Sequence, residues 1–404
     1  MPDASTKAHP PRPRVLLTDA QDRSALAGCR SLHRAGYSVD ALATSRPAAA
    51  HWSRFCDRRL VASDPREDQA GFVEELRDIV STGSYRLLIT GSDASLLAIS
   101  RHREQFEPFV ELGLPSAEVV DRCVSKQALV QAAAETGLDA PETEVCVDET
   151  EARAAAKRFG YPVVLKPQSS VFGRNGRVRQ RGSAFVRDES SLAALWPEYG
   201  VPALIQQRME GPVLSFSGVA ADGRLLAYGV SRYGRTWPPE GGSVSFAETI
   251  PPPSDLCRKA EDLLASLGWQ GVFELEVMQR DDSGFAAIDF NPRLFGSLEL
   301  ITEAGAPLTT AWCDWVLGRG KIEGEAKPGY HYRWEDAELR NFWRRLRSRQ
   351  IRPALTVLRP QRRMTRSFFR ATDPAPLLAR GLLLAKHGLR RQHSTGAKEA
   401  ANGS

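Results

Sequence analysis

The chain has 404 residues, which is longer than one typical hydrophobic core requires, so two or three domains are expected. Its hydrophobic content of 42% and charged content of 25% are ordinary for a globular protein and exclude a largely disordered chain. The net charge of +5 arises from residues 331–404, where 17 Lys and Arg face 5 Asp and Glu; a solvated helical face explains this better than nucleic-acid or membrane binding.

Residues 1–13 lack the apolar core of a signal peptide and are expected to be flexible. No apolar run approaches the roughly 18 residues that a membrane span needs. The six Cys include no CxxC pair and the seven His show no metal-ligand spacing, which argues against a disulfide framework and a zinc site. These features predict a cytoplasmic protein with reduced thiols.

Residues 14–115 alternate between apolar runs and helical patterns. RVLLTDA (14–20) is followed by a helical pattern that ends at Gly36, and residues 85–104 repeat the order of strand, polar turn and helix. This alternation predicts a parallel α/β domain. No GxGxxG motif follows the first strand, so the dinucleotide-binding fingerprint is missing.

Residues 116–320 have a different character. A helical pattern runs from Ser116 to a stop at Gly137, and a smaller, mobile unit of helices, strands and a Gly-rich loop follows at about 142–205. Residues 203–231 predict consecutive antiparallel strands. Residues 271–293 predict a β-hairpin, because DDSG separates two apolar runs. We therefore expect a second, two-lobed domain with antiparallel sheets, so that the chain as a whole is of the α/β (α+β) class.

The hairpin carries an unusual set of polar residues. Asp289, Asn291 and Arg293 alternate along its second strand and so share a face. Glu276 lies 13 residues before Asp289, a separation that lets antiparallel strands bring the two carboxylates opposite each other. Oxygen ligands without Cys or His suit Mg2+, and a nearby Arg can hold a phosphate or carboxylate. The open alternative is the solvent face of an amphipathic hairpin.

The C-terminal part is expected to be a helical, basic extension at 321–390, followed by a disordered tail at 391–404. Residues 373–389 have an apolar stripe flanked by basic side chains. A helix packed on the body of the protein is preferred over a helix at a membrane surface. Contact with nucleic acid is not expected.

Four motifs occur in the order found in the ATP-grasp superfamily. They are the Ser-Lys pair that ends at Lys126, YPVVLKP (161–167), ALIQQRMEG (203–211) and IDFNPR (288–293). Residues 116–320 thus resemble ATP-grasp proteins related to carbamoyl-phosphate synthetase and biotin carboxylase, and residues 14–115 resemble the domain that commonly precedes them. The resemblance implies that the chain binds ATP and Mg2+ or Mn2+.

The resemblance also assigns nucleotide-binding roles. Lys126 and Lys166 resemble the two lysines of the family that contact the nucleotide, and a flexible-stemmed ammonium group suits phosphate. A mobile lid over the triphosphate is expected around Ser169, Ser170, Gly173 and Gly176. The residues expected to hold adenine and ribose are Gln206, Gln207 and Met209; the family usually has a Glu in this stretch.

The remaining roles concern the metal and the transferred phosphate. Glu276, Asp289 and Asn291 match the family's metal ligands, with Asp289 in place of the more usual Glu. Arg293 matches the arginine near the transferred phosphate or acyl phosphate. Arg232 lies in a segment that resembles the acceptor pocket, and both arginines are expected to be catalytic.

The implied enzyme is an ATP-grasp ligase that forms carbon–nitrogen bonds. It would activate a carboxylate as an acyl phosphate for attack by an amine or similar nucleophile, with both substrates small molecules. Two alternatives are kept open: a bicarbonate- or carboxylate-phosphorylating enzyme of the carbamoyl-phosphate synthetase or biotin carboxylase type, and a non-catalytic nucleotide-binding protein. A homodimer is also left open.

Overall fold

The computed structural model describes residues 12–169, 171–174, 177–180, 182–280, 284–320 and 323–386; for 171–174 and 177–180 it describes the backbone alone. In these ranges, no helix is both long enough and apolar enough to pass through a membrane.

The first domain is a parallel sheet with helices on both faces, as predicted. The strand order is β3-β2-β1-β4, and every pair is parallel. Val15 and Leu17 pack toward one face and Leu16 toward the other, so alternate residues of one short strand serve two cores. The elements are β1 (Arg14–Leu17), α1 (Arg23–Arg34), β2 (Ser38–Ala43), η1 (Ala50–Trp52), β3 (Arg58–Val61), α2 (Gln69–Gly83), β4 (Leu87–Ile89), α3 (Asp93–Arg101) and η2 (Arg103–Gln105).

Two helices, α4 (Ala117–Val124) and α5 (Lys126–Glu135), occupy the segment predicted as one helix. The chain breaks at Ser125, which has extended backbone angles and whose hydroxyl accepts a hydrogen bond from the Ala128 amide. The Lys126 amide donates to the carbonyl of Gln168 at 2.9 Å. The break therefore fixes Lys126 at the start of α5, beside the small sheet.

The small sheet has the strand order β5-β10-β6-β9, and all its neighbours are antiparallel. Leu165 and Ile205 pack under the helices on one face, so Lys166 and Gln206 point to the other face. Its elements, with the adjoining hairpin, are β5 (Thr143–Cys146), α6 (Glu149–Phe159), β6 (Val163–Pro167), β7 (Val171–Arg174), β8 (Arg177–Gln180), β9 (Ala184–Val186), α7 (Glu189–Leu195), η3 (Trp196–Glu198) and β10 (Ala203–Gln207).

The large sheet follows the order β15-β14-β11-β12-β13-β17-β18, with β16 beside β12. Asp222 and Gly223 connect β11 to β12, and both residues have positive φ, as a tight hairpin turn requires. Phe216 and Leu275 pack against the long helix α8, so their strand neighbours face the opposite side. The elements are β11 (Val213–Ala221), β12 (Arg224–Trp237), β13 (Ser243–Ile250), α8 (Ser254–Leu267), β14 (Gly271–Gln279), β15 (Phe285–Asn291), α9 (Leu298–Glu303) and α10 (Leu308–Val316).

The C-terminal part is mainly helical, as predicted, but it also extends the large sheet. β17 pairs with β13, and β18 pairs with β17. These short strands were not predicted, because two or three residues carry too little periodicity. The elements are β16 (Gly324–Glu325), β17 (His331–Arg333), α11 (Glu335–Arg347), α12 (Ile351–Leu358) and β18 (Met364–Arg366), and residues 375–386 are helical.

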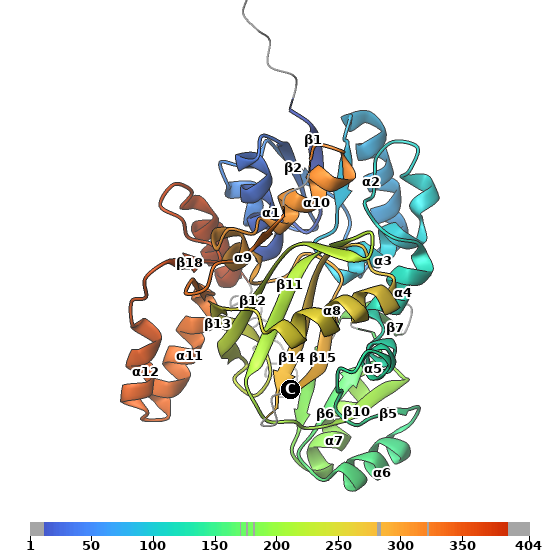
Figure 1. Cartoon of the computed structure of the whole chain (residues 1–404), viewed down its shortest axis with the longest axis vertical. Helices are drawn as coiled ribbons and strands as arrows, with labels where there is room; N and C mark the ends of the chain where they lie inside the picture. Colours follow the sequence, from blue (N-terminus) through green and yellow to red (C-terminus); the bar gives the residue numbers. More distant parts are fainter. Residues whose placement is uncertain are drawn as a thin grey trace, which may run out of the picture.

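Figure 1 shows how these parts are arranged. The large sheet occupies the centre with α8 across one face, and the first domain lies at the top. The small sheet with α6 and α7 lies at the lower right, below the open end of β14 and β15, while α11 and α12 project at the lower left.

Candidate active site

A cavity of about 470 Å3 lies between the inner faces of the small and large sheets. Val164, Lys166 and Gln206 line it from the small sheet, and Glu276 and Met278 from the large sheet. Six of the residues expected from the sequence share its wall: Lys166, Gln206, Gln207, Met209, Glu276 and Asp289.

The β14–β15 hairpin has the geometry that its spacing predicts. Glu276 is paired with Asp289, and Glu274 with Asn291, across β14 and β15. The two carboxylates face each other on the cavity wall. The Asn291 amide donates to Glu274 at 3.0 Å and its oxygen accepts from Arg293 at 3.1 Å. An amide oxygen has two lone pairs, so this bond leaves one for a metal.

Two buried lysines approach this hairpin from different elements. The ammonium group of Lys126 contacts the Asp289 carboxylate, and that of Lys166 donates to the Ile288 carbonyl at 2.8 Å. Burial lowers the pKa of Lys126 to about 8, although Asp93 and Glu276 favour its charged form. Burial, assisted by the charge of Lys126, lowers the pKa of Lys166 to about 7. An anionic ligand would stabilise both ammonium groups.

Behind the carboxylate pair lies a second, more deeply buried acid, Glu274, which is 4% exposed. Burial and the charge of Glu276 raise the pKa of Glu274 to about 7. Ser215 donates to it at 2.9 Å. The Tyr233 hydroxyl lies 2.8 Å from a Glu276 oxygen and 3.2 Å from a Glu274 oxygen. Tyr233 therefore holds the two glutamates in fixed positions.

Arg293 connects the hairpin to the first domain. Its guanidinium makes two bonds to the carboxylate of Asp93, at 2.6 and 3.1 Å. Burial disfavours ionisation of Asp93, but the charge and hydrogen bonds of Arg293 hold the pKa of Asp93 below its usual value. Asp93 begins α3 at the carboxyl edge of the parallel sheet. Arg293 thus stands where the two domains meet.

The expected nucleotide-base residues lie at the other end of the cavity. Gln206 is 5% exposed and its amide donates to the Thr143 hydroxyl at 2.8 Å. Gln207 and Met209 follow it on the cavity wall, together with Phe185. Along the cavity, the amide and apolar side chains thus come first, Lys166 follows, and the carboxylates of Glu276 and Asp289 come last.

Some expected residues are not brought to this site. Arg232 is paired with Leu214, which packs in the core under α8, so the Arg232 side chain lies on that same face, away from the cavity, and pairs with Glu248 at 3.7 Å. Ser169 forms an isolated β-bridge with Ser125. Gly173 lies in β7. Ser170 and Gly176 lie outside the described residues, and the phosphate lid stays a prediction.

The sequence reasoning did not select three residues that the geometry brings to this site. Tyr233 is next to Arg232 and shares a strand face with Ser231. The two-residue period of a strand, counted from Ser231, would therefore have selected Tyr233. Asp93 begins the helix that follows strand β4 of the parallel sheet, at an edge where ligands commonly bind. Glu274 shares a strand face with Glu276.

Comparisons with known proteins place this arrangement in context. No family model matches the chain. Over 201 residues it is 28% identical to the formate-dependent phosphoribosylglycinamide formyltransferase of Rhodococcus jostii, aligning 47% of this chain with 49% of that protein. The crystal structure of L-amino acid ligase from Bacillus licheniformis matches 80% of this chain and 79% of its own at a TM-score of 0.62 and 15% identity. Both are ATP-grasp enzymes.

The chain has the ATP-grasp fold. A further ATP-grasp structure, the biotin carboxylase domain dimer of Hydrogenobacter thermophilus 2-oxoglutarate carboxylase, matches 80% of this chain and 74% of its own at a TM-score of 0.61 and 15% identity. It was solved with MgADP, ADP and bicarbonate. The chain spans about half the length of the formyltransferase that it matches. The predicted resemblance to ATP-grasp proteins is thereby confirmed at the level of the fold.

Proposed function

We propose that this chain is an ATP- and Mg2+-dependent ligase that activates a carboxylate as an acyl phosphate for attack by an amine or similar nucleophile. One observation carries the proposal: buried Lys166 lines the same cavity as a facing pair of carboxylates, and buried Lys126 contacts one of that pair, Asp289. Positive groups beside paired acids suit a metal–triphosphate complex.

ATP would lie along the cavity with its base at the amide end. Gln206 and Gln207 can bond the adenine amino group and a ribose hydroxyl, and Met209 supplies an apolar contact. Lys126 and Lys166 would hold the phosphates, and the negative charge would offset the cost of burying their ammonium groups. The MgADP in the biotin carboxylase domain supports this choice of nucleotide.

The acids fit a hard divalent cation. Glu276, Asp289 and Asn291 offer only oxygen, and Glu276 and Asp289 face the cavity in register. They would hold Mg2+, or Mn2+, which neutralises phosphate charge when bound. Tyr233 orients Glu276 for this purpose.

The proposed reaction needs positioning more than a protein nucleophile. A carboxylate oxygen of the substrate attacks the γ-phosphorus and ADP leaves; the amine then attacks the acyl carbon and phosphate leaves. Arg293, fixed by Asp93, would contact the carboxylate or the acyl phosphate through its positive charge and the one N–H of Nη1 that the described part of the chain leaves unused. In-line positioning and charge neutralisation supply the catalysis.

A second candidate is phosphorylation of bicarbonate, which the bicarbonate bound in the biotin carboxylase domain favours. Phosphate release that requires bicarbonate and no other carboxylate would select it. A homodimer is also proposed, since that domain was described as a dimer. A cytoplasmic location stays a prediction.

The central test measures ADP and phosphate release over panels of carboxylates paired with amines, with and without bicarbonate. Lys166→Met removes the buried ammonium group but keeps an unbranched apolar side chain. We expect it to weaken ATP binding by about 10- to 100-fold, the value of one charge-assisted contact. Lys259→Met, on the outer helix α8, is the matched control.

ATP binding that is unchanged in Lys166→Met would contradict the placement of the phosphates. Tight ATP binding without turnover on any substrate pair, including bicarbonate, would favour a non-catalytic nucleotide-binding protein.

Neighbouring residues of β12 provide a second test. Tyr233→Phe removes the hydroxyl that contacts both glutamates, and we expect turnover to fall about 10-fold, the usual cost of losing an outer contact to a metal-binding group. Arg232→Ala changes the opposite face of the sheet and is expected to alter turnover by less than about 2-fold. Steady-state rates at saturating ATP compare the two variants. A larger loss of turnover in Arg232→Ala than in Tyr233→Phe would show that Arg232 belongs to the active site.

A further inference from the structure

The helices α11 and α12 project from the body of the molecule as a pair (Figure 1). They pack against each other, and α11 also packs against strands β12 and β13. Neither helix contributes a lining residue to the cavity between the sheets. The proposed ligase reaction therefore gives this helical pair no role, and its exposed surface calls for a separate explanation.

The side of α11 that faces the body is polar. Glu338 and Asn341 are buried, with 3% and 2% of their surface exposed. Glu338 accepts hydrogen bonds from Arg235 at 3.0 Å and from the Ser245 hydroxyl at 2.8 Å. The Asn341 amide donates to the Thr236 carbonyl at 3.1 Å. Buried polar contacts thus attach α11 to the large sheet.

The other side of α11 is apolar and exposed. Leu339, Trp343 and Leu346 are 55%, 49% and 37% exposed. Their spacing of four and three residues places them in one stripe. At about 100° per residue, that stripe lies across the helix from Asn341. The usual amphipathic arrangement, with the apolar stripe toward the core, is therefore reversed in α11.

The second helix repeats this stripe. Ile351, Leu355 and Leu358 have the same spacing of four and three residues and are 60%, 57% and 56% exposed. The residues that α12 buries, Ala354 and Val357, are smaller. Single apolar residues on a surface are ordinary, but six large ones in two regular stripes mark a site of interaction.

The charge beside the two stripes is positive. Residues 339–359 contain seven Arg and neither Asp nor Glu. In a helix, the next residue lies about 100° around the axis, so an arginine that follows a stripe residue flanks the stripe. Four exposed arginines do so, namely Arg340, Arg347, Arg352 and Arg359. The surface therefore combines apolar side chains with a border of guanidinium groups.

We infer that α11 and α12 dock on an anionic lipid surface. The apolar stripes enter the boundary between headgroups and acyl chains, and the flanking arginines pair with lipid phosphates. Because the helical pair projects from the body, it can meet an extended flat surface (Figure 1). A second copy of this chain would bring two equally basic surfaces together, and they would repel. A nucleic acid would attract the arginines but leave the six apolar side chains in water.

The sequence alone favoured a solvated helical face for this basic region. A count of charges does not show which side of each helix faces outward. The outward position of the apolar stripes is what changes the interpretation. Docking on lipid goes beyond the proposed ligase activity and does not depend on it.

A flotation assay with the full chain, run without nucleotide, tests the docking. One set of vesicles contains phosphatidylcholine and phosphatidylglycerol in a ratio of about 2 to 1, and the other contains phosphatidylcholine alone. We expect binding to the anionic vesicles to be at least about 10-fold stronger. This binding should weaken as salt is added, because salt screens the attraction between arginine and lipid phosphate.

Two double variants test the two parts of the surface. Trp343→Gln with Leu355→Gln removes one large apolar side chain from each stripe. Arg340→Gln with Arg352→Gln removes one flanking charge from each helix. Each double variant is expected to bind the anionic vesicles at least about 10-fold more weakly. All four positions are exposed, so the fold should be preserved, and thermal unfolding of each variant checks this.

Exposed residues elsewhere provide the matched controls. Phe109→Gln with Val147→Gln removes two apolar side chains that are 45% and 59% exposed. Arg77→Gln with Arg258→Gln removes two exposed arginines and so lowers the net charge as much as the helical variant does. Both controls should bind the vesicles like the parent.

The inference is overturned if the parent does not bind anionic vesicles, binds both kinds of vesicle equally, or is matched by either helical variant. A parent that forms a dimer in analytical ultracentrifugation without binding vesicles, and loses that dimer in Trp343→Gln with Leu355→Gln, would assign the surface to a second copy. Salt-sensitive binding to an RNA or DNA oligonucleotide, with no binding to vesicles, would assign it to nucleic acid.

Discussion

Glu276→Gln is expected to abolish the Mg2+-dependent part of ATP binding and to lower turnover by at least about 100-fold, since even outer-shell partners of a metal commonly cost 10- to 100-fold. Gln keeps the volume of the side chain and can still accept from Tyr233, so packing changes little. What is lost is one of two facing negative charges. Calorimetric titration of ATP with and without Mg2+, together with phosphate release, measures both effects.

The matched control is Glu248→Gln, which changes another glutamate of the large sheet. Glu248 pairs with Arg232 and does not line the cavity. It should leave both the Mg2+ dependence and the turnover within about 2-fold of the parent protein. An undiminished Mg2+ effect in Glu276→Gln would move the metal away from this hairpin.

The pairing in this hairpin could be predicted from the sequence because it depends on residues that are close together in the chain. Glu276 and Asp289 are joined by one short turn, so spacing and the two-residue period fix which side chains meet. The same period, applied from Ser231, selects Tyr233 and excludes Arg232. Arg232 was predicted for its charge, and the direction of its side chain was not considered.

Other parts of the site depend on contacts that no local pattern contains. Asp93 and Arg293 are 200 residues apart, and the break at Ser125 depends on the bond between Lys126 and Gln168. Propensity alone predicts one continuous helix there, and tertiary contacts override it. The short strands β17 and β18 form for the same reason, because a neighbouring strand edge is available.

Asp373→Ala is expected to lower the free energy of unfolding by about 3–5 kcal/mol, the usual cost of breaking a buried ion pair. Asp373 and Arg30 are 1% and 0% exposed. The same carboxylate accepts from the Ser53 hydroxyl at 2.8 Å and the Arg54 amide at 3.0 Å. Its removal leaves the buried Arg30 guanidinium without its nearest carboxylate and leaves two further donors without this acceptor. Urea unfolding monitored by circular dichroism measures the change.

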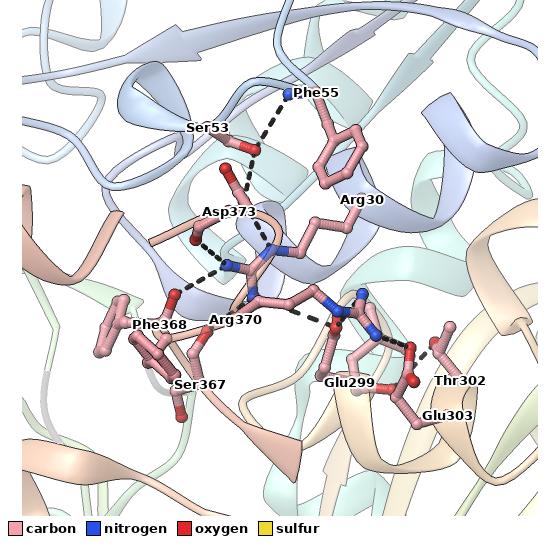
Figure 2. Close-up of polar contacts among 12 residues, drawn as sticks. Arg30, Ser53, Phe55, Glu299, Thr302, Glu303, Ser367, Phe368, Arg370 and Asp373 are labelled. Carbon is pink, nitrogen blue, oxygen red and sulfur yellow. Dashed lines mark hydrogen bonds and ion pairs between the residues drawn. The ribbon is translucent and has the colours of Figure 1, made fainter. Parts of the chain in front are cut away.

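The same substitution at an exposed pair provides the control. Asp121 bonds Arg101 at 2.9 Å, but the two side chains are 48% and 52% exposed, so Asp121→Ala should cost less than about 1 kcal/mol. The two expected losses differ because of solvent access. Water can replace the lost carboxylate at exposed Arg101, whereas the Arg30 side chain is buried where α1 meets the segment after β18 (Figure 2). Equal losses in the two variants would show that the C-terminal segment is held on the first domain by its apolar contacts and not by this ion pair.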